Sequence, residues 1–116
     1  MKKTFRKYER LCSTKVINNL FDRKNTDNEG AFAYPVRAVC KKSEDNITQV
    51  LFSVPKRQYK HAVDRNLIRR RMKESYRLNK QLLVTPYYIS FIYVGKVIEN
   101  YAVIEKGIKN CLKKLN

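Results

Sequence analysis

Basic side chains gather on one face of a predicted helix in the second half of the chain. Winding residues 63–82 at about 100° per residue places the apolar side chains on one arc. Arginine predominates on the other arc, and its planar guanidinium suits bidentate contact with phosphate and stacking on bases. The pattern predicts a surface that binds a phosphate backbone. The arc holds six cations and an amide: Arg65, Asn66, Arg69, Arg70, Lys73, Arg77 and Lys80.

A solvated charged face is the alternative interpretation of this arc. Such faces usually mix charges of both signs in pairs three or four residues apart. Here the acidic residues of the segment, Asp64 and Glu74, fall outside the arc. Repulsion among the cations is then uncompensated, which favours an anionic partner.

The segment before this helix adds further basic residues. Residues 53–63 contain Lys56, Arg57, Lys60 and His61 and lead directly into the helix. A helix N-terminus exposes free N–H groups and a positive dipole, so it also attracts anions. His61 could act as a general base, but neither a nucleophile nor a carboxylate pair accompanies it. We therefore predict that this region binds anions and that no residue of the chain is catalytic.

The charge balance points to the same partner. The 116 residues carry 26 Lys and Arg against 10 Asp and Glu, a net charge of +16, and half of it lies in residues 56–80. Few proteins tolerate such self-repulsion without a polyanion, so nucleic acid is the first candidate. A hydrophobic fraction of 43% predicts a folded chain, expected to be one domain over residues 1–116.

The sequence lacks the features of secreted and membrane proteins. No apolar run of a signal peptide follows the basic start. The most apolar run, residues 82–94, is shorter than the roughly 20 residues that span a bilayer. Cys12, Cys40 and Cys111 lack the spacing of a zinc site and are expected to be reduced thiols. We expect a cytoplasmic protein with no metal site and no membrane contact.

Periodicity predicts the elements that must position the basic residues. Residues 14–21 have the spacing of a short helix, and residues 32–40 and 47–54 alternate as two strands of a hairpin, with Pro35 at an edge or a bulge. A helix capped by Asp64 runs to about residue 83. Residues 87–94 form a central strand because both faces are apolar, and residues 98–115 an amphipathic closing helix. The expected fold is a single-domain α+β sandwich of order α-β-β-α-β-α.

The basic loop and helix also resemble a known signature. Residue types and spacing are similar to those of the protein subunit of bacterial ribonuclease P, whose helical part is called the RNR motif. The resemblance implies a fold like the second domain of ribosomal protein S5, with a left-handed β-α-β crossover that runs against the usual right-handed rule. The matching positions are Ser53, Val54, Lys56, Arg57, Lys60, Ala62, Val63, Arg65, Asn66, Arg69, Arg70 and either Lys73 or Glu74.

The resemblance implies a ribonucleoprotein. In that family a catalytic RNA, using Mg²⁺, removes the 5′ leader of precursor tRNA, while the small protein binds both RNAs. This chain would then need no cofactor of its own and would be a monomer before assembly. A leader cleft between the first helix and the sheet is expected at Ile17, Phe21 and Tyr34. The contacts expected with ribonuclease P RNA are Lys56, Arg57, Lys60, Arg65, Asn66, Arg69, Arg70, Lys73 and Arg77.

Some positions depart from the family pattern. Pro55 replaces a small serine, and Lys60 and His61 replace a Gly-Asn pair, which alters the backbone path of the loop. Ile17 stands where a phenylalanine is frequent, which removes one stacking surface.

Two other classes fit parts of the pattern. A ribosomal or general RNA-binding protein without an enzymatic partner explains the charge and the basic helix equally well, and only the signature between Lys56 and Arg70 argues against it. A DNA major-groove reader would need a helix-turn-helix pair, but residues 47–54 are predicted to be a strand. We expect no DNA partner.

Overall fold

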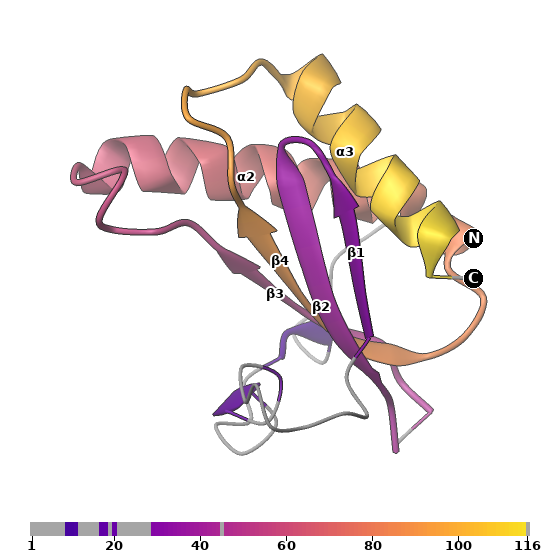
Figure 1. The fold of residues 1–116 in the computed structure, drawn as a ribbon. Coiled ribbons are helices and arrows are strands. Elements are labelled where there is room, and N and C mark those ends of the chain that lie inside the picture. Colours follow the sequence, from indigo (N-terminus) through magenta and orange to yellow (C-terminus); the bar gives the residue numbers. More distant parts are fainter. Residues whose placement is uncertain (1–8, 12–16, 19, 21–28, 45, 116) are drawn as a thin grey trace.

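A four-stranded sheet with two helices on one face makes up the computed structural model (Figure 1). It describes residues 9–11, 17, 18, 20, 29–44 and 46–115. The strands are β1 (Glu29–Ala33), β2 (Val36–Lys42), β3 (Gln49–Ser53) and β4 (Tyr87–Tyr93). The helices are α2 (Ala62–Asn79), continued by the short 3-10 helix η2 (Lys80–Leu82), and α3 (Tyr101–Lys114). Neither helix is long and apolar enough to cross a membrane, as far as the described segments go.

The predicted first helix lies mostly outside the described residues. Ile17, Asn18 and Leu20 are helical, in agreement with the prediction for residues 14–21. Phe21 and Cys12 lie outside the described part of the chain.

The sheet order is β1-β2-β4-β3, which differs from the predicted hairpin of residues 32–40 and 47–54. β4 lies between the two segments, antiparallel to β2 and parallel to β3. The apolar faces of β4 explain this arrangement, because a strand buried on both sides belongs in the sheet interior. The prediction of a central third strand is therefore confirmed, and the hairpin prediction is wrong.

The hairpin that does form, residues 29–42, contains the segment 32–40 that was predicted to be one strand. β1 and β2 pair antiparallel on either side of a turn at Tyr34 and Pro35. Pro35 has no N–H to donate to a ladder, so the chain reverses there instead of bulging. The carbonyl of Pro35 accepts a hydrogen bond from Val94 N at 2.8 Å, which ties the turn to the end of β4.

The main core fills the space between the sheet and the two helices. α2 contributes Ile68 and Met72, as the predicted apolar arc requires, and also Tyr76, which lies outside that arc; all three are at most 2% exposed. β4 contributes Phe91, whose ring stacks on Phe52 of β3 with centroids 5.8 Å apart. Strand and helix burial in a single cluster makes this one α+β domain.

The two helix starts differ in their capping. His61 is the N-cap of α2 and makes no side-chain cap bond, while Asp64, the predicted cap, lies in the first turn. The Asp64 carboxylate still stabilises the helix, because it lies near the positive N-terminal end of the helix dipole. Asn100 caps α3 by accepting a hydrogen bond from Val103 N at 3.0 Å.

A second, smaller cluster covers the face of the sheet opposite the helices. Leu11, Leu20 and Tyr88 are buried there, and Ile17, Val39 and Leu51 pack against them. Leu11, Ile17 and Leu20 therefore pack on the open face of the sheet, while Glu9 and Arg10 reach the side of the molecule where α2 lies.

Candidate nucleic-acid interface

The basic face of α2 borders a groove at the β3 edge of the sheet. Arg69, Arg70 and Lys73 line it together with Arg10 from the N-terminal segment. Its volume is about 450 Å³, and Val50, Leu51 and Phe52 supply an apolar floor. No acidic side chain is among the described residues that line it. Cations around an apolar floor can bind phosphates and cover the faces of bases at once.

Arg65 has a different role from the other arginines of the arc. Its Nη1 donates to the carbonyl oxygens of Tyr59 and Lys60, each at 2.8 Å. These bonds hold the end of the basic loop against the first turn of α2. Arg65 was predicted to contact RNA. In the structure its guanidinium instead holds the loop backbone from which the neighbouring cations extend.

Tyr59 anchors the same loop from the other side. Its hydroxyl donates to the carbonyl of Gly95 at 2.6 Å, and its ring meets Tyr93 edge to face with centroids 5.7 Å apart. Burial raises the pKa of Tyr59 to about 12, so the hydroxyl remains a donor at neutral pH. The role of Tyr59 was not predicted from the sequence, where the available signal was an aromatic residue within a polar loop.

The segment between β4 and α3 is itself held by three donors. Arg71 Nη1 donates to the carbonyl of Glu99 at 2.7 Å, and the Tyr93 hydroxyl donates to the carbonyl of Val97. With the Tyr59 bond to Gly95, these contacts fix residues 95–99 as a support for the basic loop. Arg71, which is not among the cations of the predicted basic arc, is therefore used structurally.

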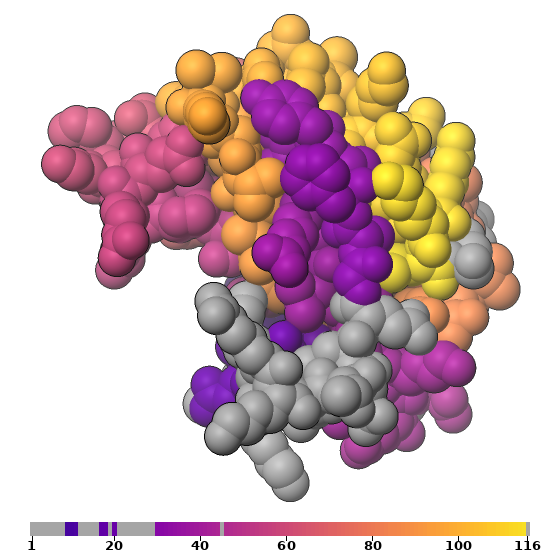
Figure 2. Space-filling model, viewed as in Figure 1, coloured from indigo at the N-terminus to yellow at the C-terminus, as the bar shows by residue number. Residues whose placement is uncertain are grey.

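The loop presents its cations on a projecting lobe. Lys56, Arg57, Lys60 and His61 are exposed, and Figure 2 shows this part of the chain, with the start of α2, extending beyond the sheet. Asn66 is also exposed and accepts a hydrogen bond from Arg69 Nη1 at 2.9 Å through its side-chain oxygen. A protruding rim of cations can reach a large partner that the sheet itself does not touch.

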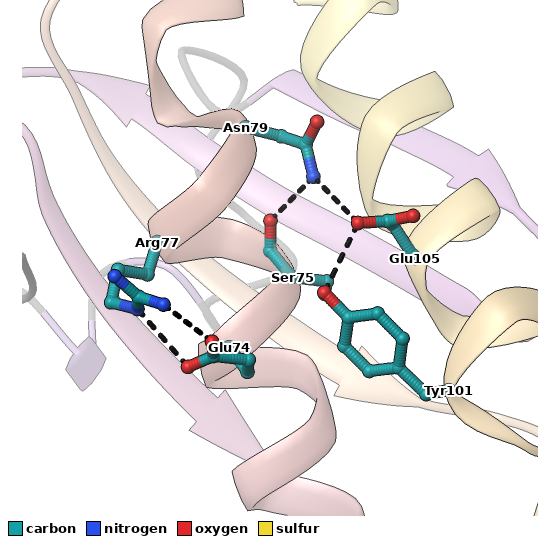
Figure 3. Close-up of polar contacts among 6 residues, drawn as sticks. All are labelled: Glu74, Ser75, Arg77, Asn79, Tyr101 and Glu105. Atoms are coloured by element: carbon teal, nitrogen blue, oxygen red, sulfur yellow. Dashed lines mark hydrogen bonds and ion pairs between the residues drawn. The ribbon is translucent and has the colours of Figure 1, made fainter. Parts of the chain in front are cut away.

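The last turn of α2 corrects the prediction of an unbalanced arc. Arg77 donates to both carboxylate oxygens of Glu74, from Nε at 3.0 Å and from Nη2 at 2.5 Å (Figure 3). The Arg77 guanidinium lowers the pKa of Glu74. Lys80 Nζ lies 3.0 Å from both carboxylate oxygens of Glu9. Side chains three residues apart can meet although their wheel positions differ, so acidic residues neutralise the cations at this end.

The predicted leader-cleft residues are not all brought together. Ile17 packs on the open face with Val39 and Leu51. Tyr34 lies in the β1–β2 turn, where its hydroxyl donates to Glu99 Oε2 at 2.7 Å. The turn is followed directly by Val36, which is paired with Tyr93 of β4. Tyr93 is five residues further along β4 than Tyr88. Strand geometry therefore separates Tyr34 from Tyr88, which packs near Ile17, by about 16 Å along the sheet.

The open face offers a different aromatic and cation beside the N-terminal segment. Phe32 of β1 is paired with Arg37 of β2, and Arg37 is in turn paired with Ile92 of β4. Both Phe32 and Arg37 are exposed. Alternation along the two strands puts this row on the same face as Val39 and Leu51. The sequence could have revealed the row had the turn at Pro35 been predicted.

The fold and the basic face together define a class: a small α+β protein built to present a cationic helix and loop. The family model described as Ribonuclease P matches residues 5–116. The chain belongs to the ribonuclease P protein family. This membership makes it a component of an endoribonuclease and implies an RNA partner and a role in maturing the 5′ end of precursor tRNA.

Individual relatives agree with the family. The ribonuclease P protein component of Porphyromonas gingivalis is 28% identical over 119 residues, covering 94% of this chain and 84% of that protein. The one from Chlorobium phaeobacteroides is 50% identical over 44 residues, 38% of this chain and 30% of its own length.

Solved structures agree in fold. The ribonuclease P protein from Thermotoga maritima has a TM-score of 0.78 at 18% identity, covering 93% of this chain and 98% of its own. The Staphylococcus aureus protein has a TM-score of 0.74 at 16% identity, with coverages of 91% and 94%.

Proposed function

We propose that this chain binds ribonuclease P RNA through the basic face of α2 and the loop before it, and that the RNA cleaves precursor tRNA. The observation that carries the proposal is the groove in which Arg10, Arg69, Arg70 and Lys73 surround an apolar floor. The exposed loop cations Lys56, Arg57 and Lys60 extend the same surface. The chemistry on the RNA uses Mg²⁺, and the protein contributes binding and orientation. The proposal includes the left-handed β3-α2-β4 crossover of the S5-like fold that the resemblance implies.

The held geometry of the loop supports this proposal. Arg65 and Tyr59 fix its backbone before any partner binds. A loop that is ordered in the free protein loses little conformational entropy on binding, so more of the interaction energy appears as affinity.

Salt dependence of binding to ribonuclease P RNA tests this interface. The seven cations of this surface, placed on phosphates, should reduce affinity by about three to four orders of magnitude between roughly 50 and 200 mM salt. Arg70→Ala should lower the slope of log affinity against log salt by about one unit. Lys109→Ala removes a charge from α3, outside this groove, and is the matched control. A slope below about three, or equal effects of the two variants, would refute the α2 interface.

For the leader we propose the open face of the sheet. Ile17, Phe32 and Arg37 combine an apolar wall, an exposed ring and a cation there. A single strand can stack on such a ring while its phosphates meet the guanidinium. Tyr34 was expected in this cleft, but its hydroxyl is bonded to Glu99 in the segment that leads into α3, so the proposal leaves it out.

A comparison of precursor with mature tRNA tests the leader site, because only the precursor has a leader. Arg37→Ala in the reconstituted complex should weaken precursor binding severalfold and leave mature tRNA binding unchanged. Lys96→Ala removes an exposed cation from the segment between β4 and α3 and should affect neither. Equal losses for both tRNAs in Arg37→Ala would remove Arg37 from the leader site.

The alternative of a general RNA-binding protein rests on the charge alone, and the family match argues against it. The two candidates differ in whether the protein stimulates cleavage by ribonuclease P RNA. Among the described residues, no group of three His, Cys, Asp or Glu side chains could hold a metal ion.

A further inference from the structure

A second groove lies at the opposite edge of the sheet, between β1 and α3. Its volume is about 540 Å³. β1 and β3 are the outer strands, so the sheet separates this groove from the one beside α2 by about 14 Å, the width of three strand spacings. The residues that matter for its chemistry are Phe32, Tyr34, Val103, Lys106, Asn110 and Lys114.

Two of its residues are exposed aromatics. Phe32 is 55% exposed and Tyr34 is 49% exposed, and both lie at the same end of the β1–β2 hairpin. The hydrogen bond from the Tyr34 hydroxyl to Glu99 fixes the position of its ring, and this bond raises the pKa of Tyr34. The ring is therefore neutral and held in place without being covered.

The other wall is a stripe of polar and cationic side chains on α3. Val103, Lys106, Asn110 and Lys114 recur every three or four residues and share one side of the helix. From Lys106 to Lys114 the stripe is about 12 Å long. Lys114 Nζ donates to the carbonyl of Phe32 at 2.5 Å, which places one ammonium at the base of the groove.

The lysines of the groove have no acidic partner among the described residues, although the Glu99 carboxylate lies beside the groove at the Tyr34 hydroxyl. None of its described lining residues is Asp or Glu, and neither Lys106 nor Lys114 is in an ion pair with any described residue. Glu105, the nearest acid in the sequence, turns toward α2, where it accepts hydrogen bonds from Asn79 and Tyr101 (Figure 3). The groove thus has positive charge and aromatic surface in one place.

We propose that this groove binds a short stretch of unpaired RNA. Bases would stack on Tyr34, and phosphates would meet Lys106 and Lys114. Rings interleaved with cations are how proteins bind single strands without sequence preference, and a protein ligand would gain less from a wall of lysines. Because α2 has its own groove at the other edge, the protein would bridge two RNA segments.

A tryptophan at position 34 can report on this groove alone, because the chain contains no other tryptophan. The test uses Tyr34→Trp combined with Arg69→Ala and Arg70→Ala, so that binding at α2 is weakened independently. Titration with a short oligouridylate should quench the fluorescence saturably. Lys106→Gln should weaken this binding severalfold, whereas Lys109→Gln, on the same helix outside the groove, should not.

Three results would overturn the proposal. One is an unchanged fluorescence at RNA concentrations that saturate the unsubstituted protein. Another is an equal effect of Lys106→Gln and Lys109→Gln, which would indicate diffuse attraction only. The third is a change that depends on protein concentration without RNA and coincides with a dimer in sedimentation, which would assign the groove to a second copy.

Lysine footprinting of the unsubstituted protein provides a second readout if the tryptophan disturbs the turn. Bound oligouridylate should protect Lys106 from acylation more than Lys109. Equal reactivity of the two lysines with and without RNA would also count against the proposal.

Discussion

At the residue scale, cations that look alike in the sequence do three different things. Arg69 and Arg70 line a groove, Arg65 and Arg71 hold backbone carbonyls, and Arg77 is paired with Glu74. The difference comes from which carbonyls and carboxylates the fold brings within reach. Charge patterning therefore predicts that a face is basic, while the partners of each guanidinium come only from the fold.

Tyr59→Phe tests whether the loop must be held for RNA binding. The variant keeps the ring and loses the hydrogen bond to Gly95, so the free energy of unfolding should fall by about 0.5–1.5 kcal/mol. Affinity for ribonuclease P RNA should fall severalfold because the loop becomes mobile. Tyr101→Phe loses a comparable bond to Glu105 and serves as the control in urea unfolding and RNA titration. If both variants bind RNA like the parent, the loop does not depend on Tyr59.

Glu74→Gln tests whether the carboxylate restrains Arg77. Removing it releases the guanidinium and deletes a negative charge beside the basic face, so RNA affinity should rise by up to about fivefold, the size of an exposed ion pair. Since Arg77 lowers the pKa of Glu74, the pair stabilises the fold above the ordinary glutamate pKa and less as the pH falls. Weaker RNA binding in Glu74→Gln would show that Glu74 positions Arg77 for RNA instead.

At the element scale, the sequence predicted the helices and strands best where the pattern of apolar residues is clear. The apolar faces of β4 and the amphipathic spacing of α3 both correspond to observed elements. The strand pairing was not predicted, because β3 and β4 are joined through α2 and alternation does not say which strand lies beside which. The basic face of α2 was predicted from the helical spacing of its residues. Arg10 joins the α2 groove, and Phe32 comes to lie beside Arg37, only through contacts that the tertiary fold creates.

Gly107→Ala tests the contact between α3 and the β1–β2 turn. A Cβ there would lie 2.9 Å from the Ala33 carbonyl oxygen and 3.0 Å from the Tyr34 carbonyl oxygen. Backbone atoms cannot move aside cheaply, so the variant should lose about 1–2 kcal/mol of unfolding free energy after the gain in helix propensity. Gly30→Ala, whose Cβ would be 3.4 Å from its nearest neighbour, is the control in urea unfolding. Equal stability of the two variants would contradict the close packing.

At the scale of the whole molecule, buried tyrosines predict the stability at alkaline pH. Burial raises the pKa of Tyr59 and Tyr101 to about 12 and raises that of Tyr76 further. In the unfolded chain these groups ionise near pH 10, so the free energy of unfolding should fall as the pH rises from about 10 toward 12. Urea unfolding across this range should show a shallower fall in Tyr76→Phe than in the parent. Parallel profiles would contradict burial of the Tyr76 hydroxyl.

The distribution of charge over the whole molecule suits a partner larger than the protein. Basic surfaces lie at both edges of the sheet, one on α2 and one on α3. A net charge of +16 on 116 residues attracts RNA from a distance, while the grooves select where it lies. With RNA in both of the proposed grooves, the protein would act as an adaptor between RNA segments.

The most direct test of the central claim is cleavage of 5′-labelled precursor tRNA at low Mg²⁺. Reactions contain this protein alone, a bacterial ribonuclease P RNA alone, or both. We predict cleavage at the mature 5′ end only when both are present. Tight binding without stimulation of the RNA would contradict the account and favour a general RNA-binding protein, and cleavage by the protein alone would place an active site on this chain.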